Sequence, residues 1–330
     1  MRSSKADVTR VALIKYLVNK SLSLEALILT PDMAPLSRNI EDYPEGIIIP
    51  IDKPYRWTSA DVIRKVKYTA IRHFGKKNLK VGHAGTLDPL ATGVLLVCIG
   101  KATKLAEELQ SHDKEYMAGI TFGATTPSYD LEKEIDRFFP HEHITASSVA
   151  EALPAFIGEQ DQIAPLFSAK SVDGVRAYEL ARKLHREGKT LDEAAAELIR
   201  VSRISITELE LMEYHGIGEC GLKNRATPLA AGGGARDEVV GGVVFQTTLS
   251  NASSRINVPD NSELGLPRAV VRMACSKGTY VRAFARDLGE ALGTGAHLDS
   301  LQRSRSGIFR VENALTVEQA ISLLSAPKSL

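Results

Sequence analysis

The spacing of hydrophobic and polar residues divides the chain into short strands and helices. A continuous apolar run at 47–51 is typical of a buried strand, and 93–100 predicts a second short buried strand. Between them, Thr58 or Ser59 can cap a helix. The apolar positions of this helix recur at helical spacing and are Ile63, Val66, Ala70 and Phe74. One face of the helix is therefore expected to pack inward.

The same patterns extend along the rest of the chain. Alternation predicts strands at 114–123, 200–213 and 268–275, with a candidate strand pair at 239–249. Helical patterns cover 103–110, 145–153, 175–187, 279–292 and 316–324, whereas the glycine-punctuated segment 75–88 is predicted to be a loop. Because strands and helices alternate without a regular strand–helix–strand repeat, we expect an α+β fold around a mixed sheet.

Changes in local amino-acid composition along the sequence also indicate how the chain is organised. Residues 1–44 are expected to form an N-terminal extension, and 45–315 the main body of the protein. Glycine runs and a polar stretch mark an insertion at about 214–267. Residues 316–330 are expected to form a short C-terminal helix and tail, with Thr316 and Gln319 spaced as a capping box. Only 15 residues follow Leu315, which we interpret as too few for a further domain.

Composition narrows the class of protein. With 330 residues, of which 44% are hydrophobic and 25% charged, the chain has the composition of a soluble globular protein. No apolar stretch approaches the ~18 residues of a membrane span. The 3 cysteines form no CxxC pair, so a disulfide framework and a cysteine zinc site are both unsupported. His141 and His143 have no obvious third ligand, so we expect a surface turn and no metal.

Charge is segregated although the total is nearly balanced. The 41 basic and 40 acidic residues give a net charge of +1. Between 62 and 80, however, all charged residues are cations: Arg64, Lys65, Lys67, Arg72, Lys76, Lys77 and Lys80. Such a stretch is either a solvated helix face or a surface for a polyanion, and charge pattern alone favours neither.

The segment 81–93 contains a displayed carboxylate. Its three glycines permit close backbone approach and unusual dihedral angles. Pro89 disfavours a helical conformation of Asp88 and so displays that side chain on a stiff loop. An isolated Asp-Pro pair usually just starts a turn or caps a helix. The surrounding sequence decides between the two interpretations.

Further motifs follow in order along 45–213 and 268–315. They are Lys53-Pro54 with Thr58-Ser59, the 81–93 block, Lys114-Glu115-Tyr116, Gly123 to Thr126 with Asp130, Arg176 to Arg182, Lys277 to Arg282, and Leu301 within 295–303. Together they closely resemble the bacterial-type tRNA pseudouridine synthase family, TruB type, which isomerises the uridine of the TΨC loop at position 55. The resemblance implies the fold of that family, with a mainly antiparallel central sheet flanked by helices. It also implies that 45–315 is the pseudouridine synthase catalytic domain, and we expect no separate RNA-binding domain of the kind that some relatives carry after it.

The resemblance also implies roles for individual residues. Asp88 matches the catalytic aspartate, Tyr116 the tyrosine that stacks on the target uracil, and Arg282 the arginine that pairs with the aspartate. Tyr280 and Leu301 match pocket residues. His83 matches a histidine that supports RNA binding and the flipped-out loop. The remaining expected substrate contacts are Lys53, Arg64, Lys67, Lys80 and Tyr178.

Isomerisation of uridine involves no net redox change and no input of energy, so we expect no cofactor. The expected partner is the TΨC stem-loop of tRNA. We expect no membrane association and no obligatory protein partner, and a monomer in the cytoplasm. Two alternatives stay open: an RNA chaperone that folds tRNA with catalysis incidental, and a guide-RNA-dependent relative of the dyskerin type.

Two positions depart from the family pattern. Arg56 stands where the family usually has glycine, which can alter that turn without touching the reacting groups. Ser171 replaces a lysine, so a basic contact is lost or taken over by Lys170.

Overall fold

The computed structural model describes residues 26–165, 171–172, 175–176, 201–219, 256 and 258–325. Within these residues one 10-stranded sheet forms the centre of the molecule. Its strands are β1 (Leu27–Ile28), β2 (Ile47–Lys53), β3 (Val81–Ala84), β4 (Ala91–Ile99), β5 (Lys114–Phe122), β8 (Gly158–Ile163), β11 (Val201–His215), β12 (Arg268–Cys275), β13 (Ala296–Ser306) and β14 (Phe309–Arg310). The main path runs β1-β2-β4-β13-β5-β12-β11-β8, with β3 paired to β4 and β14 to β13.

Most neighbouring strands are antiparallel, and only the β1–β2 and β4–β13 pairs of this sheet are parallel. The other described strands form two small ribbons, β6 (Ala124–Thr125) with β7 (Arg137–Phe138) and β9 (Ser171–Val172) with β10 (Val175–Arg176). The predicted α+β class with a mixed, mainly antiparallel sheet is therefore confirmed.

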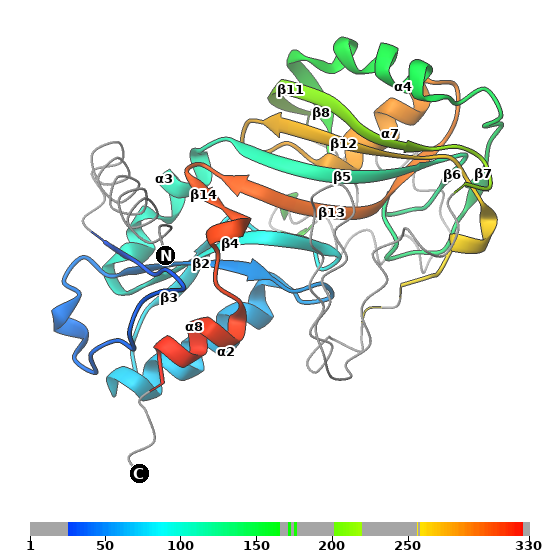
Figure 1. Ribbon diagram of the computed structural model, residues 1–330. Helices are drawn as coiled ribbons and strands as arrows, with labels where there is room; N and C mark the ends of the chain where they lie inside the picture. Colours follow the sequence, from blue (N-terminus) through cyan, green and yellow to red (C-terminus); the bar gives the residue numbers. More distant parts are fainter. Residues whose placement is uncertain are drawn as a thin grey trace, which may run out of the picture.

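Helices cover the two ends of the sheet. The α-helices are α2 (Ser59–Phe74), α3 (Ala106–Ser111), α4 (Ala146–Ala152), α7 (Val281–Ala291) and α8 (Val317–Leu323), and the 3-10 helices are Ile40–Asp42, Gly100–Leu105, Leu153–Phe156, Ser262–Leu264 and Val311–Asn313. Helices α2 and α8 lie side by side at the end formed by β2 and β3, whereas α4 packs against β11 near the other end and α7 packs against the central strand β13 (Figure 1). None of the described helices is long and apolar enough to cross a membrane.

The predicted helix after the first strand has the expected caps and buried face. Thr58 accepts a hydrogen bond from the Asp61 backbone N–H, and the Asp61 carboxylate accepts one from the Thr58 N–H. The helix ends at Gly75, whose φ of +63° suits a residue without a Cβ. Of the four predicted inward positions, Val66, Ala70 and Phe74 are buried against the sheet, whereas Ile63 is only partly buried. Val62, which was not predicted, is fully buried. The predicted cap at Thr316 also forms, so α8 begins where the sequence indicated.

Three assignments are corrected or refined by the structure, and a fourth falls outside the residues it describes. The predicted loop 75–88 contains strand β3, which is stabilised by pairing with β4. The predicted helix 175–187 begins instead with β10, paired to β9; residues 177–187 lie outside the described part. The predicted helix 103–110 is a 3-10 turn followed by the short α3. The candidate strand pair at 239–249 also lies outside the described residues.

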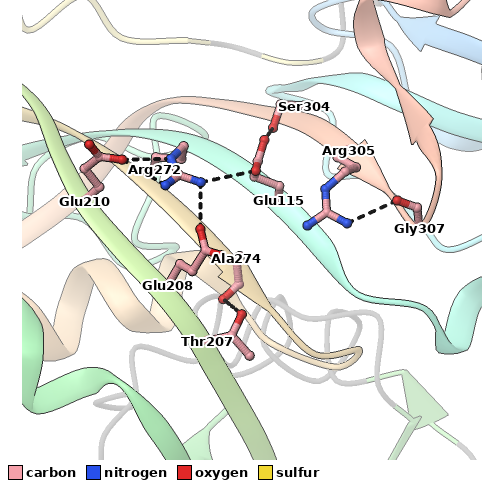
Figure 2. Close-up of polar contacts among 9 residues, drawn as sticks. All are labelled: Glu115, Thr207, Glu208, Glu210, Arg272, Ala274, Ser304, Arg305 and Gly307. Atoms are coloured by element: carbon pink, nitrogen blue, oxygen red, sulfur yellow. Dashed lines mark hydrogen bonds and ion pairs between the residues drawn. The ribbon is translucent and has the colours of Figure 1, made fainter.

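A ladder of polar and charged side chains crosses four strands of the sheet (Figure 2). Arg272 of β12 donates to Glu208 and Glu210 of β11 at 2.9 and 2.8 Å. On its other side it contacts Glu115 of β5 at 3.4 Å, and Ser304 of β13 donates to the same carboxylate at 2.8 Å. Arg272 is thus already neutralised by carboxylates, so this part of the sheet is unsuited to binding a polyanion.

Candidate active site

Asp88 lies in the tight connection between β3 and β4. The chain reaches it through Gly85, whose φ is +91°. On the helix side, the Ser59 hydroxyl accepts from the Leu87 N–H at 3.0 Å and donates to the Leu87 carbonyl at 3.2 Å. The Asp88 side chain is 38% exposed, so it is reachable from solvent while its backbone is fixed. This agrees with the predicted stiff loop.

Arg282, in the first turn of α7, provides the partner of Asp88. Its Nε lies 2.9 Å from Asp88 Oδ2 and 3.6 Å from Asp130 Oδ2, and its side chain is 7% exposed. Its Nη1 donates to the Ser128 carbonyl at 3.2 Å. Burial by itself lowers the pKa of Arg282, but the carboxylates of Asp88, Asp130 and Glu132 outweigh burial and raise it. The guanidinium therefore remains charged between two carboxylates.

Asp130 is a member of this site to which the sequence assigned no role. Its side chain is 7% exposed, and it accepts hydrogen bonds from the Ser128 hydroxyl at 2.6 Å and from the Glu132 N–H at 2.9 Å. Burial raises the pKa of Asp130, against the opposing charge of Arg282. Nearby, burial and the charge of Asp130 raise the pKa of Glu132 to about 7. The only sequence signal was the position of Asp130 at the end of the 123–130 motif.

Tyr116 lies on β5 and is almost wholly buried, at 9% exposed. Burial raises the pKa of its phenol, which also accepts a hydrogen bond from Arg303. Arg303 of β13 is 2% exposed and donates from Nε to the Val94 carbonyl at 2.7 Å and from Nη2 to the Gly85 carbonyl at 3.1 Å. Arg303 thereby connects Tyr116 to β4 and to the loop that presents Asp88.

A small pocket opens beside the Asp88–Arg282 pair. Its volume is about 20 Å³, which holds roughly one water molecule. It is lined by Asp88, Leu90, Ala91, Asp130, Arg282, Leu298, Asp299, Ser300 and Leu301. Leu301, which the resemblance predicts to be a pocket residue, is among these lining residues. Tyr280 lies outside this lining, and its backbone N–H and carbonyl are paired with the side chain of Gln162 at 2.8 and 3.1 Å.

Lys53 occupies a different environment from the one expected of a substrate contact. It is fully buried, and its Nζ donates to the carbonyls of Pro54, Trp57 and Pro89 at 2.9, 2.6 and 3.2 Å. These three acceptors use all three N–H donors of an ammonium group. Because Pro89 follows Asp88 directly, this geometry favours a role in positioning the loop.

The turn that carries Arg56 keeps a left-handed backbone. Arg56 has φ +61°, a conformation that glycine adopts without steric cost. Its N–H donates to the Pro89 carbonyl at 2.9 Å, and its Nη2 donates to the Ile256 carbonyl at 2.5 Å. The arginine therefore preserves the turn and adds a contact to the end of the predicted insertion.

The remaining predicted contacts lie around this centre. His83 is on β3 and partly buried, and burial together with Arg303 lowers its pKa. Arg64 pairs with Asp61 at 2.8 Å on the exposed side of α2, whereas Lys67 and Lys80 line an open hollow. Tyr178 lies outside the described residues, and only the backbone of Ser171 is described.

The histidines at 141 and 143 bind backbone carbonyls. His141 Nδ1 lies 3.0 Å from the Phe139 carbonyl oxygen, and His143 Nε2 lies 2.8 Å from that of Leu292. Among the residues that the structure describes, no cluster of three or more His, Cys, Asp or Glu side chains is suited to hold a metal ion.

The fold and the site together define an α+β protein that presents one accessible carboxylate, held by a buried arginine, beside a tyrosine and a leucine-lined pocket. Such a carboxylate can act as a nucleophile or as a base. Comparison with known proteins identifies the family.

The family model of the TruB pseudouridylate synthase N-terminal domain matches residues 72–219, and that of the tRNA pseudouridylate synthase B C-terminal domain matches residues 282–325. The tRNA pseudouridine synthase B of Phocaeicola vulgatus is 45% identical over 84% of this chain and 92% of that protein. Its namesakes from Bacteroides thetaiotaomicron and Thermus thermophilus are 43% and 38% identical, over 84% and 85% of this chain and 92% and 78% of those proteins. The chain therefore belongs to the TruB family of pseudouridine synthases.

Proposed function

We propose that this protein is a tRNA pseudouridine synthase that isomerises the TΨC-loop uridine at position 55. The observation that carries the proposal is the ion pair of Asp88 with Arg282 beside one pocket, in a chain of this family. Tyr116 does not line that pocket, but it lies close enough to Asp88 for the carboxylate charge to add to burial in raising the pKa of its phenol. The reaction breaks the bond between N1 of uracil and C1′ of ribose, turns the base, and joins C5 to C1′. C5 then loses its proton to solvent and N1 takes up a proton, so the product is an isomer of the substrate.

Asp88 is the reacting carboxylate in this proposal. It either attacks C1′ directly, with uracil as the leaving group, or removes a ribose proton in an elimination to a glycal. Both routes require a carboxylate held at a fixed position. The contact of 2.9 Å to Arg282 and the anchored backbone on either side supply that position.

The target base must leave the RNA stack before it can reach Asp88. Extrusion costs a few kcal/mol, and stacking on an aromatic ring returns about 1 to 3 kcal/mol per base. Tyr116 is the aromatic side chain proposed for this contact. Because the pocket holds roughly one water, side chains around it must yield when a base enters.

Release of tritium from C5-labelled uridine in an unmodified tRNA transcript tests this function. Wild-type protein should release tritium in amounts matching the tRNA, and Asp88→Asn, which keeps the side-chain shape, should release none. Normal release by Asp88→Asn would overturn the role of the carboxylate. Absence of release from wild type, with tight tRNA binding, would favour the chaperone alternative. A monomeric state and a cytoplasmic location stay predictions, and light scattering tests the first.

A further inference from the structure

The cations at 62–80 differ in what they contact. Arg64 pairs with Asp61 at 2.8 Å, and Lys76 pairs with Glu41 at 3.2 Å. Arg72 stacks on Tyr68, with its guanidinium carbon 5.4 Å from the ring centroid. These three cations are thus already engaged by neighbouring side chains of the protein.

Three other lysines surround a single surface hollow. This lysine hollow has a volume of about 510 Å³. It is lined by Lys67, Lys77, Asn78, Leu79, Lys80, Val81, Gly82 and Thr103. No carboxylate is among the lining residues, so three lysines line one space without a counter-charge in that lining. Such an arrangement concentrates positive potential and favours an anionic occupant.

The composition of the hollow argues for phosphate groups on a polymer. Small-molecule sites of this size are mostly apolar and enclosed. Here the apolar contribution comes from Leu79 and Val81, and the hollow is open to solvent at the surface. Lysine binds phosphate as a point charge without demanding a fixed geometry. These properties suit the backbone of a nucleic acid better than a single small molecule.

Strand β3 links the lysine hollow to the catalytic loop. Val81 and Gly82 line the hollow, and the same strand ends at Ala84, just before the loop that presents Asp88. Lys80 and Asp88 are eight residues apart in sequence, so their Cα atoms lie within about 29 Å of each other. One folded RNA can therefore contact the hollow while its loop occupies the active site.

From this placement we propose that the lysine hollow binds the phosphodiester backbone of the same RNA whose uridine reaches Asp88. The proposal rests on the proposed function for the identity of the RNA. The proposal assigns RNA contacts to Lys67, Lys77 and Lys80, which line the hollow. It assigns none to Lys76, which forms an ion pair with Glu41. The contact contributes to affinity and not to the chemical step.

A pair of matched double variants tests the proposal. Lys67→Gln/Lys77→Gln removes two charges from the lysine hollow. Lys65→Gln/Lys76→Gln removes the same charge from the same segment but leaves the hollow intact, because neither residue lines it. Affinity for an unmodified tRNA transcript is measured by equilibrium binding between 50 and 300 mM KCl, and the rate at saturating protein by single-turnover tritium release.

Each lost phosphate contact should reduce the slope of log affinity against log salt by about 0.7 to 0.9. Over the roughly tenfold range from about 1 M to about 0.1 M salt, this change of slope lowers the affinity at the lower salt by about 5- to 8-fold. The hollow variant should therefore lose about 25- to 60-fold in affinity, with an unchanged rate at saturation. The control should change affinity less than about 3-fold, because its cations are outside the contact. Equal losses in both variants would show only general electrostatic attraction and overturn the proposal.

Two further results bear on the identity of the occupant. Inorganic phosphate, titrated at constant ionic strength, should compete with tRNA only weakly. Tight phosphate binding to wild type with an unchanged salt slope in the hollow variant would identify a small-anion site instead. Binding is measured separately from tritium release, so the two proposals can fail independently. A wild-type protein that binds tRNA without releasing tritium would refute the proposed function, and the comparison of salt slopes would still decide whether the lysine hollow binds the RNA.

Discussion

Replacing Arg282 by methionine should separate the two consequences of its position between Asp88 and Asp130. Methionine approximates the length of the arginine stem but carries no charge. Asp130, at 7% exposed, then remains as a buried carboxylate without its cation, and Asp88, at 38% exposed, loses the group that fixes it. The first change affects folding stability and the second affects the reaction.

The two carboxylates contribute unequally to the stability loss. Breaking a buried ion pair by removing one partner costs about 3 to 5 kcal/mol. Asp130 retains its hydrogen bonds from the Ser128 hydroxyl and the Glu132 N–H, so we expect a loss near the lower limit, about 3 kcal/mol. Water screens the more exposed Asp88, which adds at most about 1 kcal/mol. The double variant Arg282→Met/Asp130→Asn removes the uncompensated charge and should recover about 2 kcal/mol.

Urea unfolding of the wild type, both single variants and the double variant gives the coupling free energy directly. In parallel, single-turnover tritium release should be at least about 100-fold slower in Arg282→Met and should not recover in the double variant, because Asp88 is still unfixed. A coupling below about 0.5 kcal/mol would mean that Arg282 does not balance the charge of Asp130. A rate within threefold of wild type would refute the positioning of Asp88 by Arg282.

Three further predictions concern residues around the site. The raised pKa of Glu132, about 7 when folded against 4.5 ordinarily, means that the folded state binds the proton more tightly. The free energy of unfolding of the wild type should therefore fall as pH rises from 4.5 to 7. In urea unfolding, Glu132→Gln should be more stable than wild type by up to about 3 kcal/mol at pH 8, and should show no such gain at pH 4.5. Tyr116→Phe removes the hydroxyl that accepts a hydrogen bond from Arg303 and should lower the free energy of unfolding by about 1 to 2 kcal/mol. Tyr116→Leu also loses the aromatic ring proposed to stack on the base, and should bind and convert tRNA about 5- to 100-fold less well than Tyr116→Phe. Gly93→Ala would place a Cβ against the backbone of Arg303 in β13, so thermal unfolding should show a loss at least about 2 kcal/mol greater than in Gly75→Ala, where a positive φ occurs in open space.

The elements that the sequence predicted well are those whose environment is uniform along their length. Strand β2 is apolar and buried from Ile47 to Ile51, and α2 carries both its capping residues and its buried stripe within 58–75. In these segments local preference and tertiary burial agree. The pattern of residues alone was then sufficient.

Strand β13 shows why other elements escaped prediction. Its sequence contains several polar residues that the fold buries: His297, Gln302, Arg303 and Ser306. Their partners come from distant segments, as with the Ala124 carbonyl that lies 2.9 Å from His297 Nδ1. A prediction from hydrophobicity alone treats such positions as exposed. The buried polar residues of β13 therefore interrupt the apolar pattern by which a central strand is recognised.

The sequence predicted the central residues of the candidate site but not the buried side chains that hold them. The motifs gave Asp88, Tyr116 and Arg282 through family resemblance, and the structure brings these residues together. No spacing in the sequence indicates that Asp130 shares the guanidinium of Arg282, or that Lys53 is buried beneath Pro89. Burial and pairing of charges depend on the packing of the whole sheet, which local patterns do not contain.

The way the catalytic loop is held explains why so many side chains around it are polar and buried. Its backbone is fixed from three elements: Ser59 of α2 contacts Leu87, Lys53 of β2 contacts Pro89, and Arg303 of β13 contacts Gly85. Each of these side chains bonds the loop through its backbone, so the Asp88 carboxylate itself stays available to Arg282 and to substrate. Burying Lys53 and Arg303 costs desolvation energy that an apolar core would not. The cost is consistent with a loop whose position must be fixed closely, since misplacement of a reacting group by about 1 Å can slow a reaction 100-fold.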